Sequence, residues 1–198
     1  MGRKIVAIVS SYRKSGTIDT AVQAVLEGAR TKGAETHIIY LADQHLEFCT
    51  HCRKCTQTPA WKRVPCTQND GLESILQQLE AADAIVLGSP VNHYNATSIF
   101  RQFLERQLGF LYWPWGQALP TPQDKHLTRK AVLVSSAIMP GFCIPLLTEA
   151  PKALRVAATS LGARTVGSLW IGLAGKAPHH SLSPRILARA RQMGARLA

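Results

Sequence analysis

The stretch KIVAIVSSYRKSGT, residues 4–17, decides how the chain is expected to fold. Its first half is basic and then continuously apolar, which is typical of a strand buried on both faces of a sheet. Its second half is a polar turn, after which apolar residues recur at helical spacing as far as Ala29, and Gly33 stands where a helix would end. A strand, a polar loop and a helix in this order form the first unit of an α/β protein.

The same unit repeats along the chain. Segments rich in valine and isoleucine predict five strands, at residues 4–10, 36–41, 84–88, 131–136 and 165–171. Helical segments separate them, so we expect a parallel sheet with helices on both faces and the strand order 2-1-3-4-5. In such a sheet a ligand binds at the carboxyl ends of the strands, where the order reverses between strands one and three.

Two later helices have marked starts. Asp70, with Glu73 three residues on, forms a capping-box pattern before an apolar helical stripe. Ser183 followed by Pro184 predicts the cap and first turn of the last helix.

Composition limits the class of protein. The 198 residues, 46% of them hydrophobic, suit one globular domain spanning residues 1–198. No apolar run approaches the roughly 20 residues of a membrane-spanning helix, and the basic N-terminus lacks a signal-peptide cleavage pattern. We therefore expect a cytoplasmic protein with no membrane partner. The net charge is +11, and no acidic residue follows Glu149, which predicts a basic surface in the last quarter of the chain.

The loop at residues 10–17 joins the first strand to the first helix. Its hydroxyl groups, its backbone N–H groups and the positive end of the helix converge on one place, which suits a phosphate monoester. The loop has neither the G-x-G-x-x-G pattern of dinucleotide-binding folds nor the Gly-Lys-Ser/Thr ending of a P-loop. An ordinary strand-to-helix turn with a serine or threonine cap is the alternative.

The loop after the third strand reads GSPVNHYNAT, residues 88–97. Together the two loops resemble those of the NAD(P)H-dependent FMN reductase and multimeric flavodoxin family. The first is similar to that family's Gly-Ser-x-Arg-x-x-Gly-x-Thr phosphate loop, and the second to its Gly-Ser-Pro-x-Tyr-x-x-x-x-Thr/Ser flavin loop. The resemblance extends over most of the chain and implies a flavodoxin-like three-layer sandwich with a five-stranded parallel sheet.

The resemblance also implies which residues hold FMN. The phosphate would lie in the first loop with a charge-assisted contact from Arg13, the isoalloxazine ring against the second loop, and the end of the fourth strand would supply a third contact. The implied FMN-binding residues are Ser11, Arg13, Ser15, Thr17, Ile18, Pro90, Val91, Asn92, Tyr94, Asn95, Ser135 and Ser136. Ile18 stands where the family often has a phosphate-binding threonine, and Asn92 where many members have a tyrosine. No separate catalytic residue is expected, because the flavin carries the chemistry.

The function that the resemblance implies is an FMN-dependent oxidoreductase. It would transfer electrons from NADH or NADPH to a small-molecule acceptor such as a quinone, a flavin or an azo compound, and would act as a homodimer or homotetramer. The alternative is an FMN electron-transfer protein, with or without an iron–sulfur cluster, that acts between protein partners. A zinc-stabilised nucleic-acid-binding module is not favoured, because the basic residues are scattered and no nucleic-acid-binding motif is present.

Four cysteines form a distinct feature in a cysteine-rich insertion at residues 42–69. Cys49, Cys52 and Cys55 form C-x-x-C-x-x-C, and Cys66 follows. Four thiolates in one loop can hold a 4Fe–4S cluster, and the spacing resembles that of the iron-sulfur flavoproteins of the same family, although the fourth cysteine of those proteins usually follows sooner. Zinc or free thiols are the alternatives. The interleaved lysines and arginines can guide an acidic redox partner.

A second long segment, residues 108–128, is rich in aromatic residues. Long loops in compact domains usually carry function. This one is expected to cover a planar ligand, to contact a second subunit, or to form a local apolar lid.

Overall fold

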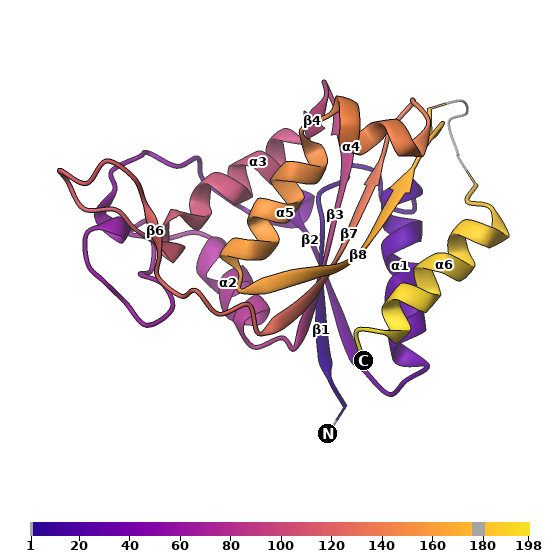
Figure 1. Ribbon diagram of the computed structural model, residues 1–198, viewed down its shortest axis with the longest axis horizontal. Coiled ribbons are helices and arrows are strands. Elements are labelled where there is room, and N and C mark those ends of the chain that lie inside the picture. The colour runs from indigo at the N-terminus through magenta and orange to yellow at the C-terminus, as the bar shows by residue number, and fades with distance from the viewer. Residues whose placement is uncertain (1, 176–180) are drawn as a thin grey trace.

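The computed structural model describes residues 2–175 and 181–198. Its sheet has five parallel strands in the order β2-β1-β3-β7-β8, which confirms the predicted order (Figure 1). The strands are β1 Lys4–Val9, β2 Glu35–Tyr40, β3 Ala84–Asn92, β7 Arg129–Ser136 and β8 Ala163–Ile171. β3 runs beyond its predicted end at residue 88, because Ser89 and Pro90 still pair with β7. It then turns back through β4, Asn95–Ala96, which pairs with it antiparallel.

Helices cover both faces of the sheet and give the expected three layers (Figure 1). One face carries α1, Thr17–Arg30, and α6, Pro184–Ala195; the other carries α2, Leu72–Glu80, α3, Ser98–Glu105, and α5, Ala150–Ser160. The alternation along β1 shows why both faces of the sheet exclude water: Ile5 and Ala7 face α1 and α6, whereas Val6 and Ile8 face the other layer. All four side chains are fully buried.

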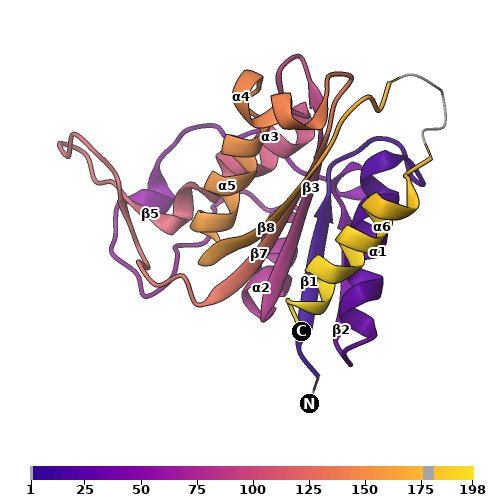
Figure 2. The ribbon, with the colours of Figure 1, turned by 45° about the vertical axis from the view of Figure 1, so that its right-hand side comes forward.

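The helices α1 and α6 lie side by side over the sheet (Figure 2). They approach so closely that a Cβ atom on Gly194 would lie 1.7 Å from the carbonyl oxygen of Val25, and one on Gly28 would lie 1.9 Å from that of Arg191. Only glycine fits at these two contacts. The close approach therefore fixes the position of the last helix on the first.

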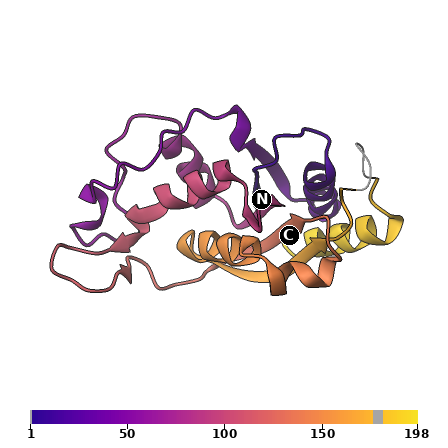
Figure 3. The same cartoon turned by 90° about the horizontal axis from the view of Figure 1, so that it is seen from above.

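A projecting part of the molecule, here called the cysteine lobe, consists of residues 42–69 and 106–128 (Figures 1 and 3). It extends from the α3 and α5 side of the sheet, away from α1 and α6. Its short elements are η1 Leu41–Asp43, η2 Lys54–Thr56, η3 Arg106–Phe110, and the paired strands β5 Leu111–Tyr112 and β6 Thr121–Pro122. The two segments, distant in sequence, pack on each other.

The predicted helix starts have different outcomes. Ser183 caps α6, because its Oγ accepts the amide of Ile186 at 3.4 Å. Asp70 accepts the amide of Leu72 at 3.1 Å, but the predicted capping box is wrong, because the Glu73 carboxylate instead binds Arg63. No helix in the described ranges is long and apolar enough to cross a membrane.

Candidate cofactor site

Two loops meet where the neighbouring strands β1 and β3 end, as predicted for the switch point of the sheet. The Ser10 hydroxyl donates to the carbonyl of Gly88 at 3.1 Å, and the Thr97 hydroxyl donates to the carbonyl of Ser10 at 3.0 Å. These polar groups are fully buried, so their hydrogen bonds hold the loops in one relative position. At the surface, the Tyr12 and Ser98 hydroxyls are 2.8 Å apart and form another link.

The first loop, residues 11–17, leads directly into α1. Arg13 is exposed, and its amide donates to Ser11 Oγ at 3.2 Å in a tight local turn. Ser15 has a left-handed backbone with φ of +59°, which is uncommon for a residue with a side chain. No side chain caps α1 at Gly16. The start of this 14-residue helix therefore offers backbone N–H groups to an anion.

Asp19 is a buried acid that sequence reasoning did not single out. Its Oδ2 accepts the amide of Ser15 at 2.6 Å, and its Oδ1 accepts the hydroxyl of Tyr40 at 3.0 Å. Burial and then the bond to Asp19 raise the pKa of Tyr40, which keeps its hydroxyl protonated as the donor. Asp19 thus fixes the left-handed turn at Ser15. The sequence does place this acidic residue in the first turn of a helix, but an acid there is commonly explained by its interaction with the helix dipole alone.

The second loop is a tight hairpin between β3 and β4. Asn92 pairs with Asn95, and the residues between them, His93 and Tyr94, have φ of +45° and +62°, as in a type I′ turn. Glycine or asparagine usually occupies such positions, so this backbone is strained. The turn is held from outside, because the carbonyl of Tyr94 accepts the amide of Glu149 at 2.8 Å. The Tyr94 side chain is 67% exposed.

The remaining residues predicted to bind FMN are more buried. Pro90 and Val91 are half-buried below the hairpin. Ser135 and Ser136, at the end of β7, are both buried, and the Ser135 hydroxyl donates to the carbonyl of Ser89 at 2.8 Å. Ile18 lies in the core against Gly88, so its side chain is not directed at the loop surface. At this position only the backbone amide is available to a ligand.

These loops suit FMN chemically. The first combines Arg13, the hydroxyls of Ser15 and Thr17, and an uncapped helix start, which is the kind of donor set that a phosphate dianion requires, whereas the Ser11 hydroxyl already donates to the carbonyl of Arg13 at 3.3 Å. The second presents backbone amides and an exposed aromatic ring beside it. Both belong to the same carboxyl edge of the sheet.

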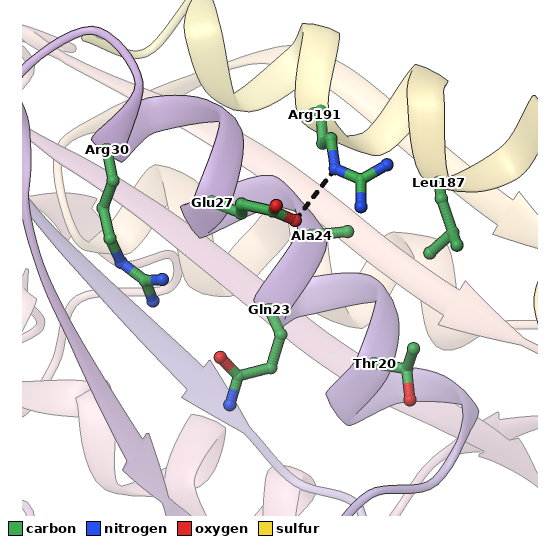
Figure 4. Close-up of a pocket in the computed structure, with 7 residues that line it drawn as sticks. All are labelled: Thr20, Gln23, Ala24, Glu27, Arg30, Leu187 and Arg191. Atoms are coloured by element: carbon green, nitrogen blue, oxygen red, sulfur yellow. Dashed lines mark hydrogen bonds and ion pairs between the residues drawn. The ribbon is translucent and has the colours of Figure 1, made fainter. Parts of the chain in front are cut away.

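A pocket away from these loops lies between α1 and α6 (Figure 4). It is lined by Thr20, Gln23, Ala24, Glu27, Arg30, Leu187 and Arg191. Glu27 and Arg191 form an ion pair of 2.8 Å across it. The pocket faces outward from the helices and includes none of the predicted FMN-binding residues.

The cysteine lobe is held together first by Arg53. Its guanidinium lies between two indole rings, 3.8 Å from the centroid of Trp113 and 4.0 Å from that of Trp115, and it donates to the carbonyl of Trp113 at 2.5 Å. Arg53 itself has a left-handed backbone and is 8% exposed. Since it stands between Cys52 and Cys55, the aromatic segment fixes the cysteine segment. Trp115 and Leu119 of the aromatic segment stay exposed, so covering a planar ligand, contacting a second subunit and forming a local apolar lid all remain predictions for it.

Arg106 anchors the base of the lobe. Its guanidinium binds the Asp70 carboxylate at 2.7 Å and 3.2 Å, and both side chains are almost completely inaccessible. It also donates to the sulfur of Cys66 at 3.4 Å. Burial acts to raise the pKa of Asp70, but hydrogen bonds from Arg106 and from the amides of Glu47 and Leu72 outweigh burial, so the net effect lowers this pKa.

The cysteines differ from one another. Burial, together with the nearby sulfurs of Cys66 and Cys49, raises the pKa of Cys55 to about 11, whereas a backbone hydrogen bond from Lys54 lowers that of Cys52. All five cysteines are free. Within residues 2–175 and 181–198, no three histidine, cysteine or acidic side chains are arranged to hold a metal ion. As they lie here, the four sulfurs do not fit a 4Fe–4S cluster or zinc.

Comparison with known proteins identifies a family. The family model described as NADPH-dependent FMN reductase matches residues 3–178. An iron-sulfur flavoprotein of Archaeoglobus fulgidus is 28% identical over 123 residues, covering 62% of this chain and 51% of that protein. One of Methanosarcina thermophila is 26% identical over 105 residues, covering 53% and 52%. The chain spans about half the length of these curated relatives.

Solved structures share the fold at low sequence identity. An NAD(P)H:quinone oxidoreductase from Methanothermobacter marburgensis superposes with a TM-score of 0.71 at 16% identity, covering 100% of this chain and 96% of that one. An FMN-dependent NADH-azoreductase from Bacillus anthracis gives 0.66 at 14% identity, covering 98% and 96%. An archaeal flavodoxin gives 0.57 at 13% identity, covering 98% and 95%. These likenesses show the flavodoxin-like fold.

Proposed function

Because the chain belongs to the NADPH-dependent FMN reductase family, we propose that it binds FMN at the loops after β1 and β3 and works as an oxidoreductase. The electron donor would be NADH or NADPH, and the acceptor a small molecule such as a quinone, a flavin or an azo compound. FMN bound there would supply the redox chemistry, two-electron transfer from a nicotinamide donor to the acceptor.

One observation carries this proposal: an uncapped helix start, an exposed arginine and a strained hairpin meet at one edge of the sheet. The helix start and Arg13 would bind the phosphate through charge-assisted hydrogen bonds. Asp19 would support them indirectly, because it holds Ser15 in its left-handed turn.

The hairpin would position the flavin ring. A backbone turn held by the β3–β4 pairing and by the Glu149 amide can present its amides to the ring without rearranging, and the strain at His93 and Tyr94 is of the kind that is stored at functional sites. Pro90 and Val91 would supply apolar surface beside the ring. Ser135 would act on the ring only through the backbone, because its hydroxyl is already bound to Ser89.

The test combines cofactor analysis with turnover. The protein is purified without oxygen, its flavin and iron are quantified, and oxidation of NADH and NADPH is followed with quinone or azo acceptors. One FMN per chain with steady nucleotide oxidation is the expected result. If no flavin binds even after FMN is added, the proposal is wrong.

A second candidate function is electron transfer between proteins through FMN and an iron–sulfur cluster. The names of the curated relatives favour it, as do the four cysteines in one lobe. A cluster would require the sulfurs to move from the positions described here. Stoichiometric iron and sulfide without turnover of small acceptors would select this candidate over the first.

A further inference from the structure

A pocket of about 400 Å³ opens beside the β3–β4 hairpin, between it and the start of α5. Its size is in the range of pockets that hold small molecules. Tyr94, Pro145 and Leu147 form an apolar wall, and Lys152 and Arg155 form a charged one. Leu147 belongs to the short helix α4, Ile144–Leu147, which stands next to β4 in Figure 1.

The pocket is joined to the hairpin by the backbone. The amide of Glu149 donates to the carbonyl of Tyr94, and α5 begins at the next residue. Ala150 and Leu154 are fully buried and fix α5 against the sheet. Residues three apart on a helix lie on one side of it, so Lys152 and Arg155 project together on the exposed side.

The charge of the pocket is positive. Lys152 and Arg155 line it together with one acid, Glu149, which pairs with Lys152 at 3.5 Å. Both partners of that pair are mostly exposed, so the pair is weak. Arg155 has no ion pair in the described part of the chain. A second anion can therefore bind here, with an arginine fork that suits phosphate.

We propose that this pocket binds the phosphorylated adenosine end of NADPH, with Arg155 and Lys152 on the 2′-phosphate and Tyr94 against the adenine. The inference rests on the proposed function, because Tyr94 belongs to the hairpin proposed to position the flavin and also lines this pocket. Tyr94 would therefore separate the flavin site from the nucleotide site. NADH lacks the 2′-phosphate, so the pocket would make NADPH the preferred donor. Arg155 would then determine specificity.

The experiment compares the two nucleotides in the FMN-loaded protein. In Arg155→Leu, kcat/KM for NADPH should fall about tenfold, the effect of losing one charge-assisted hydrogen bond, whereas kcat/KM for NADH stays unchanged. The kcat/KM of Arg155→Lys for NADPH should lie between those of the wild type and of Arg155→Leu. Glu149→Gln keeps the backbone bond to Tyr94 but removes the negative charge, so kcat/KM for NADPH should rise about two- to threefold.

Arg185→Leu is the matched control, since Arg185 is an exposed arginine on α6, across the sheet from α5. It should leave both nucleotides unaffected. Equal losses for NADH and NADPH in Arg155→Leu, or no loss for either, would overturn the inference.

A binding measurement separates this inference from the proposed function. Adenosine 2′-monophosphate should bind to the wild-type protein, as followed by NMR, and more weakly to Arg155→Leu, with or without flavin. If it binds both proteins equally, or neither, the pocket does not recognise the 2′-phosphate. A protein that binds no FMN and oxidises neither nucleotide, but passes this binding test, would refute the proposed function and leave the anion pocket in place. If the pocket instead binds a sulfonated azo acceptor, Arg155→Leu would lower kcat/KM for that acceptor and leave kcat/KM for both nucleotides unchanged. That result would also overturn the inference.

Discussion

The sheet with its edge loops and the cysteine lobe are held together by different kinds of interaction. In the sheet, buried apolar side chains and backbone pairing determine the arrangement: the core residues on β1 and β3 are inaccessible, and these two strands pair in continuous register. In the lobe, three arginines bind particular partners, Arg53 two indoles, Arg63 two glutamates and Arg106 one aspartate. The sheet should therefore tolerate changes of similar volume, whereas the lobe should depend on single side chains.

The largest expected effect is at the base of the lobe. Asp70→Asn leaves the Arg106 charge buried without its partner, which should lower the free energy of unfolding by about 3–5 kcal/mol at neutral pH. Because the pKa of Asp70 is lowered in the folded protein, its contribution is present above the unfolded pKa and is lost as the pH falls through the folded pKa. Urea unfolding at several pH values should show the variant and the wild type converging in acid.

Glu105→Gln is the control for that change, because Glu105 forms an exposed ion pair of 3.8 Å with Arg101 on α3. It should cost less than about 0.5 kcal/mol. If Asp70→Asn costs as little, the base of the lobe is not held by the buried pair.

In the sheet region the sensitive point is the contact of α1 with α6. Gly194→Ala places a methyl group against the carbonyl of Val25 and should destabilise the protein by about 1–3 kcal/mol. An alanine in an unhindered helix would instead stabilise it by up to about 1 kcal/mol. The sign of the change in melting temperature therefore decides whether the two helices touch as described.

The lobe should respond separately at Arg53. Arg53→Leu removes the cation between two indoles and should cost about 1–2 kcal/mol, most of it confined to residues 42–69 and 106–128. Tryptophan fluorescence and hydrogen exchange follow the lobe, while FMN affinity follows the sheet edge. If FMN binding is lost together with the order of the lobe, the lobe and the sheet edge are not independent of each other as described.

The smallest effect is expected at Glu73, which is 41% exposed in its pair with Arg63. Glu73→Gln should cost less than about 1 kcal/mol. The hydrogen bond from Arg63 lowers the pKa of Glu73, so the small difference between the two proteins should disappear as the pH falls through that lowered value. A difference that persists in acid would show that a contact other than the charge is lost.

The same contrast explains what the sequence could predict. Ile5 to Val9 form an apolar run with only one stable environment, and the predicted strand order is confirmed. The packing of Arg53 on Trp113 has no local signature, because the two residues are 60 positions apart. The local pattern at Asp70 predicted its bond to Leu72, but the stronger partner, Arg106, is 36 positions away. Asp19 was missed for a different reason: its partner Ser15 is only four positions away, but an acid in the first turn of a helix is commonly explained by the helix dipole alone.

A titration with FMN and with riboflavin tests most directly whether the loop at residues 11–17 binds the phosphate of FMN. The wild-type protein should bind FMN much more tightly than riboflavin, which lacks the phosphate. Arg13→Ala should weaken FMN binding by about 10- to 100-fold and leave riboflavin binding unchanged. Equal affinity for both flavins in the wild type, or an Arg13→Ala variant that binds FMN as tightly as the wild type, would contradict the account.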